Sequence, residues 1–181
     1  MNKIAVVYAS KYGSTKQYAQ WIAEELSADL FESNKIPINE LKEFDTIIYG
    51  GRLYAGTIKG INLIIKNLEL IKNKNLIIFT CGLADPTHEE NLKALNNNFK
   101  KIFKEDMITK IKFFHFRGNI NYKKLTFTHK IMMSLLKFSI NKKDPKTLTE
   151  ENKEFLKTYG KEVVFANKST IAPLIEFIKT Y

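Results

Sequence analysis

The pattern that most constrains this chain is an alternation of short apolar runs with amphipathic segments. Five runs are each short enough to be one buried strand: Lys3–Ala9, Asp29–Glu32, Phe44–Gly50, Asn75–Cys81 and Ile111–Phe116. Between them apolar residues recur at helical spacing, as at Tyr18, Ile22 and Leu26. Alternating strands and helices predict parallel strands with right-handed crossovers. We therefore expect a doubly wound α/β sheet of five parallel strands in the order 2-1-3-4-5.

The region after the predicted sheet has a different character. Residues 122–143 form a basic amphipathic insertion after strand 5. A helix is predicted from Thr149 to about Asn167, and a final short helix after Ser169. Because 181 residues suit one well-filled core and the sequence contains no linker or internal repeat, we expect residues 1–181 to form a single domain.

The formal charge of +10 is concentrated in one interval of the sequence. No acidic residue occurs between Asp106 and Asp144, and the interval holds nine basic residues: Lys110, Lys112, Arg117, Lys123, Lys124, Lys130, Lys137, Lys142 and Lys143. A one-sided basic patch indicates an anionic partner, or a solvated face that only aids solubility. The interval lacks a recognised nucleic-acid motif, so we expect no nucleic-acid partner.

The single cysteine and the three histidines limit the chemistry. Cys81 has no partner for an intramolecular disulfide, which fits a reducing cytosol. The sequence shows neither a signal-peptide pattern nor about 18 consecutive apolar residues, so we expect a cytoplasmic protein, or one peripheral at the inner face of the membrane. His88, His115 and His129 lack metal-ligand spacing, so we predict no metal site and nominate no catalytic side chain.

The loop after the first predicted strand has the chemistry of a phosphate site. It reads Ser10, Lys11, Tyr12, Gly13, Ser14 and Thr15, and a helix begins immediately after it. Ligands of doubly wound sheets bind beyond the carboxyl ends of the strands, and helix N-termini attract anions. The loop matches neither the Walker A nor the dinucleotide-binding glycine motif. A helix cap followed by a turn glycine is the alternative interpretation.

Three loops together resemble those of the flavodoxin family. Ser10, Gly13 and Thr15 match the family's phosphate loop, and Tyr12 stands where a threonine is common. The segments after the third and fourth strands resemble its ring-binding loops: Arg52, Leu53, Tyr54, Ala55 and Gly56, then Cys81, Gly82, Leu83, Ala84 and Asp85. The resemblance implies a flavodoxin-like three-layer fold that binds FMN through these loops. It also implies that Tyr54 stacks on the ring; the alternative is a loop aromatic that covers the sheet end. We expect Cys81 to be a small buried residue.

The details are most similar to flavodoxin-domain proteins of the menaquinone-dependent protoporphyrinogen dehydrogenase type. The first loop, the pI of about 9.5 and the segment from Arg117 to Ile140 carry this likeness. It implies an FMN-dependent oxidoreductase that dehydrogenates a porphyrinogen-like or other apolar anionic substrate and passes electrons to a quinone. Two alternatives stay open: a basic electron-carrier flavodoxin that shuttles electrons between redox proteins, and a domain that has lost flavin and acts by macromolecular contact.

The insertion at 122–143 has several possible roles. Its apolar residues cover a wide arc of a predicted helix, with Lys123, Lys130 and Lys137 on a narrow polar strip. Such a helix needs cover on several sides. It can pack internally, form a dimer contact, make peripheral contact with a membrane or a quinone, or line a pocket for a flat apolar anionic substrate.

Overall fold

The computed structural model describes residues 2–54, 56–103 and 105–180. Its centre is a parallel sheet of five strands: β2 (Asp29–Glu32), β1 (Ile4–Ala9), β3 (Thr46–Tyr54), β5 (Asn75–Gly82) and β6 (Ile111–Arg117), in that order across the sheet. A short strand, β4 (Thr57–Ile58), pairs antiparallel with the end of β3. The predicted fold class and strand order are confirmed, because β4 lies off the path of the five parallel strands.

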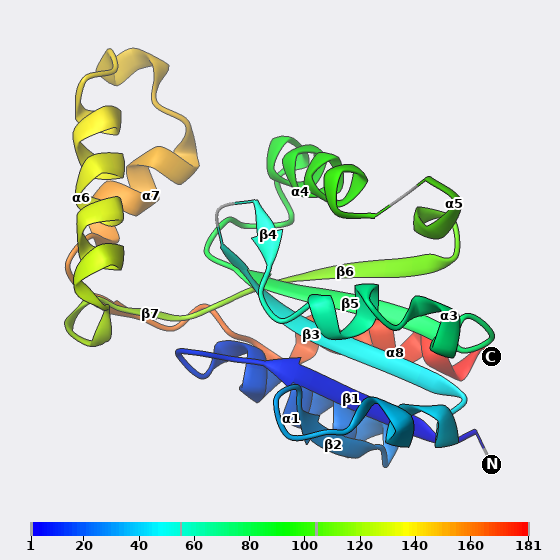
Figure 1. The fold of residues 1–181 in the computed structure, drawn as a ribbon. Coiled ribbons are helices and arrows are strands. Elements are labelled where there is room, and N and C mark those ends of the chain that lie inside the picture. The colour runs from blue at the N-terminus through cyan, green and yellow to red at the C-terminus, as the bar shows by residue number, and fades with distance from the viewer. Residues whose placement is uncertain (1, 55, 104, 181) are drawn as a thin grey trace.

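Helices cover both faces of the sheet, as parallel strands require (Figure 1). One face carries α1 (Ser14–Leu26) and α8 (Ala172–Lys179). The other carries a 3-10 helix, η1 (Ile38–Glu43), and the helices α2 (Asn62–Ile65), α3 (Leu68–Ile71), α4 (Glu89–Ile102) and α5 (Glu105–Ile108). Because the five strands are parallel, their carboxyl ends lie at one edge of the sheet.

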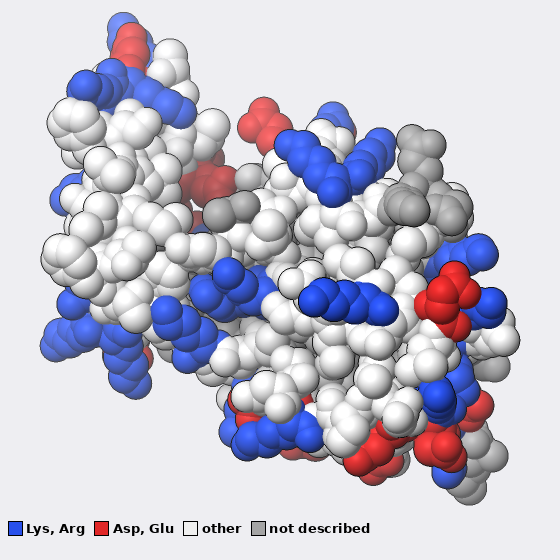
Figure 2. All heavy atoms as spheres, viewed as in Figure 1, with Lys and Arg blue, Asp and Glu red and all other residues white. Residues whose placement is uncertain are grey.

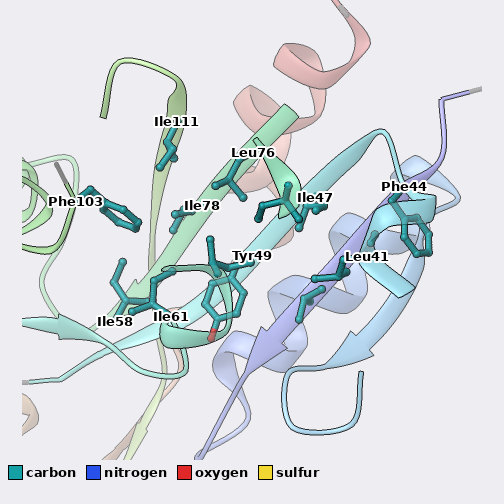
Figure 3. Packing of buried hydrophobic residues seen from close by; sticks show 14 of the residues in the cluster. Leu41, Phe44, Ile47, Tyr49, Ile58, Ile61, Leu76, Ile78, Phe103 and Ile111 are labelled. Carbon is teal, nitrogen blue, oxygen red and sulfur yellow. The ribbon is translucent and has the colours of Figure 1, made fainter. Parts of the chain in front are cut away.

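Side-chain alternation along the strands divides the core into two clusters. Val7, Ile47 and Ile78 pack with η1, α2, α3 and α4, and Figure 3 shows part of this cluster at close range. Val6 and Ile48 point to the opposite face, where α1 and α8 cover them. Successive strand residues point to opposite faces, so a near-continuous apolar run fills both layers.

After β6 the chain leaves the sheet and returns to it only at α8. This inserted segment (residues 118–167) contains β7 (Ile120–Asn121), η2 (Tyr122–Lys124), α6 (Phe127–Asn141), η3 (Pro145–Thr147), α7 (Glu150–Thr158) and β8 (Glu162–Val163). Its two ends are joined by antiparallel pairing of β7 with β8. The short helix η4 (Lys168–Ile171) then leads into α8. In Figure 1, α6 and α7 stand as a column beside the sheet.

Two predicted boundaries were wrong for local reasons. The helix expected up to Asn167 ends at Thr158, because Gly160 adopts φ +83° and the chain turns back as β8. The third strand continues to Tyr54 rather than Gly50, because β4 extends its pairing as a hairpin. Apolar residues from Ile61 to Leu68 are also spaced for one helix, but the structure divides this segment into α2 and α3 at Asn67, whose backbone is not helical.

The basic interval does not form a single face. Lys110 and Lys112 lie at the start of β6, at the other end of the strand from Arg117. Arg117 itself is an ion-pair partner of Asp85 and Glu154. The other lysines of this interval lie on α6 or directly next to it. Among the helices of the described residues, none combines the length and apolarity needed to cross a membrane.

Candidate functional site

A cavity of about 770 Å³ opens at the carboxyl ends of β1, β3 and β5. This size is within the range of about 300–1,000 Å³ that is typical of cofactor sites. One side is lined by the sheet and its loops, and the other by the inserted segment. The residues from the inserted segment are Gly118, Asn119, Ile120, Asn121, Lys124, Leu125, Thr126, His129, Met132, Met133, Glu162, Val163 and Val164.

The three predicted loops meet at this cavity, although they are separated by more than 20 residues in the chain. Of the predicted site residues, those that line it are Ser10, Lys11, Tyr12, Ser14, Thr15, Arg52, Leu53, Tyr54, Cys81, Gly82 and Leu83. Four others lie outside its lining: Gly13, Gly56, Ala84 and Asp85. The predicted contact at Ala55 lies outside the described residues.

The phosphate-type end of the cavity is the N-terminus of α1. Gly13 precedes the helix with φ +97°, a conformation that L side chains rarely adopt, and nothing lies within 4 Å of where its Cβ would be. Its N–H donates to the Ser10 hydroxyl oxygen at 3.2 Å, which shapes the loop. Over the described part of the chain, no side chain caps α1. The first N–H groups of the helix therefore face a space that an anion can enter.

The wall of the cavity at the end of β3 is aromatic and basic. The guanidinium of Arg52 lies 4.9 Å from the centre of the Tyr54 ring, and Lys59 Nζ lies 4.8 Å from it. The Tyr54 hydroxyl contacts Met132 Sδ at 3.7 Å, which brings the end of β3 against α6. Arg52 and Tyr54 belong to the strand itself, so the sheet holds them more rigidly than a loop would.

His129 belongs to the cavity, although no pattern in the sequence distinguished it. Its Nδ1 lies 2.6 Å from the Tyr12 hydroxyl, and its ring lies 5.2 Å from that of Tyr54. Burial lowers the pKa of His129, and the nearby charges of Lys11 and Arg52 lower it further. The imidazole is therefore neutral at pH 7. Its Nδ1 is hydrogen-bonded to the Tyr12 hydroxyl, whose oxygen also accepts the Thr126 N–H at 3.3 Å.

The Tyr12 hydroxyl is perturbed by the same surroundings. Burial raises the pKa of Tyr12, but the hydrogen bonds with Thr126 and the charge of Lys11 outweigh that effect, so the pKa is lowered overall. Tyr12 is the residue that departs from the common threonine of the phosphate loop. In this chain its phenol reaches the first turn of α6, a distance that a threonine hydroxyl does not span.

Arg117 fastens the inserted segment to the sheet. Its Nε donates to the Leu83 carbonyl at 3.0 Å, and its guanidinium pairs with Asp85 and Glu154. The guanidinium also lies 3.7 Å from the centre of the Phe165 ring. Burial raises the pKa of Asp85, but hydrogen bonds from Thr87 and the Arg117 charge outweigh it and lower the pKa overall. Asp85 therefore acts in this structure as an anchor for the inserted segment.

Asn119 attaches the inserted segment to the sheet at a second place, the loop of residues 10–15 that precedes and begins α1. Its N–H donates to the Ser14 hydroxyl at 2.9 Å, and its side-chain oxygen accepts the N–H groups of Phe165 and Ala166, each at 2.8 Å. The preceding Gly118 is closely packed, since a Cβ there would lie 2.8 Å from Cys81 Sγ. The two ends of the inserted segment are thus held together beside the start of α1.

Two titratable side chains, Cys81 and His115, are uncharged at neutral pH. Burial raises the pKa of the Cys81 thiol to about 12, so it stays protonated and is a poor nucleophile at neutral pH. Burial lowers the pKa of His115 to about 4, and its Nδ1 lies 2.7 Å from the Thr80 hydroxyl oxygen. Neither arrangement resembles a nucleophile paired with a base. Among the described residues, no group of three or more metal-ligating side chains is assembled.

A doubly wound sheet with an open helix N-terminus after β1 and a cavity beyond its carboxyl ends defines an α/β protein that binds a phosphorylated cofactor. The sequence model of the flavodoxin domain matches residues 5–148, well over half of the chain. The chain belongs to the flavodoxin-domain family, and its cofactor is FMN. No curated protein matches the sequence.

Several solved structures resemble this one at low sequence identity. Oxidised flavodoxin 2 from Bacillus cereus is 22% identical, with 64% of this chain and 84% of that one covered and a TM-score of 0.43. The Trp repressor binding protein from Bacillus subtilis is 18% identical, with coverage of 66% and 85% and a TM-score of 0.46. A flavoprotein in complex with FMN from Lactobacillus acidophilus NCFM is 18% identical, with coverage of 65% and 93% and a TM-score of 0.43.

The residues of the cavity fit FMN at both of its ends. The uncapped N-terminus of α1 and the Ser10 and Thr15 hydroxyls suit a terminal phosphate. Leu53, Tyr54 and Leu83 provide apolar and aromatic side chains that suit a heteroaromatic ring. Lys11 and Arg52 add positive charge to the lining of the cavity, which complements the negative charge of the phosphate.

Proposed function

We propose that this protein is an FMN-dependent oxidoreductase with a substrate site between the flavin and the inserted segment. The substrate is an apolar anionic compound of the porphyrinogen type, and the electron acceptor is a quinone. The observation that carries the proposal is the composition of the cavity wall. Met132, Met133 and Leu125 give it an apolar surface, and Lys124 adds a cation at its edge.

Three loops hold the cofactor in this proposal. Ser10, Lys11, Tyr12, Ser14 and Thr15 would hold the phosphate, and the ring would lie between Arg52 to Tyr54 and Cys81 to Leu83. When bound, FMN supplies hydride or single-electron acceptance, so the protein does not need a nucleophile or a metal. The residues of the chain bind the two partners, orient them and exclude water from the space between them.

The overall reaction balances without a further reagent. In each turnover the substrate loses two electrons and two protons as one carbon–hydrogen and one nitrogen–hydrogen bond are broken, and one quinone gains these two electrons and two protons as it becomes a quinol. Three such turnovers convert a porphyrinogen into a porphyrin. The apolar wall favours both partners, since each is flat and largely hydrophobic. Lys11, Arg52 and Lys124 favour carboxylates on the substrate.

An electron carrier is the second candidate, and membership of the flavodoxin-domain family supports it. A carrier needs only FMN and an exposed edge through which a protein partner exchanges electrons. The inserted segment (residues 118–167) favours the enzyme, because it adds an apolar wall to the cavity that a carrier does not need.

The first experiment is a visible absorption spectrum of the purified protein with FMN. A bound-flavin spectrum is expected, and a protein that leaves FMN free in solution contradicts both candidates. The second is an anaerobic assay of the FMN-loaded protein with protoporphyrinogen and menaquinone. Formation of protoporphyrin with quinol supports the enzyme, whereas absence of turnover together with rapid electron exchange with a redox protein supports the carrier.

A matched pair of variants tests the substrate wall. Lys124→Glu changes a residue that lines the cavity, and Lys123→Glu changes its exposed neighbour outside that lining. For a carboxylated substrate we expect Lys124→Glu to raise KM about tenfold, as loss of one charge-assisted contact would do. FMN affinity stays unchanged in both variants, and equal KM values for the two would contradict the proposed wall.

A further inference from the structure

The outer face of α6 carries a continuous stripe of exposed apolar side chains. Phe127, Ile131, Leu135 and Phe138 are spaced four, four and three residues apart, which places them on one side of the helix. Their exposed fractions are 78%, 43%, 63% and 59%. We call these four residues the outer stripe. It runs for about 16 Å along the helix at 1.5 Å per residue.

The opposite side of the same helix is already occupied. Ile140 is buried, and His129 and Met133 face the cavity described above. The Lys137 ammonium lies 4.3 Å from the centre of the Tyr159 ring and so holds α6 against α7. Because the inner side fixes the rotation of the helix, α6 cannot turn to bury the outer stripe against its own domain.

Basic side chains surround the outer stripe. Five lysines near it are exposed, and they are Lys123, Lys124, Lys130, Lys142 and Lys143. Lys142 Nζ lies 4.4 Å from the centre of the Phe138 ring, so at least one cation lies beside the apolar groups. The helix itself has no acidic residue. Figure 2 shows the column of α6 and α7 as largely uncharged, with basic groups gathered at both of its ends.

Two of the neighbouring acidic residues are paired with cations outside this set of lysines. Glu154 of α7 is paired with Arg117, and Glu150 is paired with Lys153. Asp144, which ends the acid-free interval, accepts the backbone N–H of Lys146 at 2.9 Å and keeps its negative charge, but five exposed lysines stand against it. The surface around the outer stripe therefore combines uncovered apolar groups with unbalanced positive charge.

We propose that the outer stripe docks α6 on an anionic lipid surface, with the helix lying in the plane of the interface. Apolar side chains along one side of a helix enter the boundary between headgroups and acyl chains, and lysines at its flanks meet lipid phosphates. Each lysine near such a surface adds to the attraction. This inference rests on α6 alone and does not depend on which substrate the cavity takes.

A second copy of the chain fits the outer stripe less well. Two helices paired along their stripes would bring their flanking lysines together, in a protein that already carries a net charge of +10. A stripe of four side chains also falls short of the roughly 800 Å² per partner of a standard stable interface. An anionic bilayer satisfies both the apolar groups and the charges.

The test is co-sedimentation of the FMN-loaded protein with vesicles. Phosphatidylcholine vesicles with about 30% phosphatidylglycerol are compared with phosphatidylcholine alone, at low and high salt. The double variant Ile131→Glu/Leu135→Glu removes the apolar contact, and Leu92→Glu, at an exposed leucine of α4, is its matched control. The variant Lys130→Glu/Lys142→Glu reverses the charge, with Lys100→Glu/Lys101→Glu on α4 as control.

We expect the native protein and both α4 controls to bind the anionic vesicles and to be released by salt. Each α6 variant should bind about tenfold more weakly or worse, since a charge in the acyl region is costly. Circular dichroism and the flavin spectrum verify that the variants are folded. The proposal is overturned if the native protein does not bind anionic vesicles or if the α6 variants bind them as well as their controls do. It is also overturned if sedimentation velocity shows a dimer that Ile131→Glu/Leu135→Glu dissociates.

Discussion

The hydroxyl of Tyr12 lies 2.6 Å from Nδ1 of His129, and this contact joins the phosphate-type loop to the first turn of α6. The two residues are 117 positions apart in the chain. The loop that is expected to hold the FMN phosphate therefore also positions α6, which lines part of the cavity. Because burial and the charges of Lys11 and Arg52 lower the pKa of His129, the imidazole stays neutral at pH 7.

Tyr12→Phe removes this hydroxyl while keeping the ring. We expect the free energy of unfolding to fall by about 1 kcal/mol, the usual value for one or two hydrogen bonds. The amide groups of the first turn of α6 should lose protection in hydrogen exchange. Thr128→Ala, at an exposed position in the same turn, is the control. Equal protection in the two variants would show that the Tyr12–His129 contact does not hold α6.

Gly13 and Gly160 form a matched pair for testing the phosphate site. Both have positive φ, +97° and +83°, and neither has an atom within 4 Å of its added Cβ. Alanine should therefore cost about 1–2 kcal/mol of backbone strain at each position. Only Gly13→Ala should weaken FMN binding, by about tenfold, because it distorts the loop before α1. A fluorescence titration of FMN measures this, and equal affinities in the two variants would contradict the assignment.

Arg117→Ala should destabilise the inserted segment. The substitution leaves Asp85 and Glu154 without their cation and removes the contact with Phe165. We expect a loss of about 2–3 kcal/mol, since the guanidinium is largely buried. Lys153→Ala breaks an exposed pair with Glu150 and should cost less than about 0.5 kcal/mol. Denaturant titrations compare the two variants, and similar losses would mean that Arg117 is not an anchor.

His115 makes the fold sensitive to acid. Its pKa in the folded state is about 4, below the ordinary value of 6.5, so the unfolded chain binds more protons between these two values. Its contribution is complete above pH 6.5 and is lost as pH falls toward 4, a difference of about 3 kcal/mol. His115→Gln should flatten this part of the stability profile. An unchanged slope in chemical unfolding between pH 4 and pH 6.5 would assign the acid sensitivity to other groups.

Cys81 should be inert until the protein unfolds. Burial raises its pKa to about 12, and its side chain is 5% exposed. A thiol reagent at pH 8 should therefore label almost none of the native protein and one thiol per chain in denaturant. Rapid labelling of the native protein would show that β5 opens near the cavity.

The sequence by itself determined the parallel sheet and its order, and it predicted which loops lie together at one cavity. Short runs such as Val6 and Val7 alternate between two faces, and that periodicity is local information. Loops after parallel strands must meet at one edge, so Ser10, Arg52 and Cys81 were brought together by topology alone. The family match to a flavodoxin domain agrees with that pattern.

Only the tertiary structure decided what the inserted segment does. The arc of apolar residues on α6 did not reveal which of them face the cavity, as Met133 does, and which face outward, as Leu135 does. That choice depends on the rotation of the helix, which is set by the distant contacts of Tyr12 and Lys137. His129 and Arg117 acquired their roles in the same way. Their partners lie far away in the sequence, and no local spacing encodes a contact between residues more than 30 positions apart.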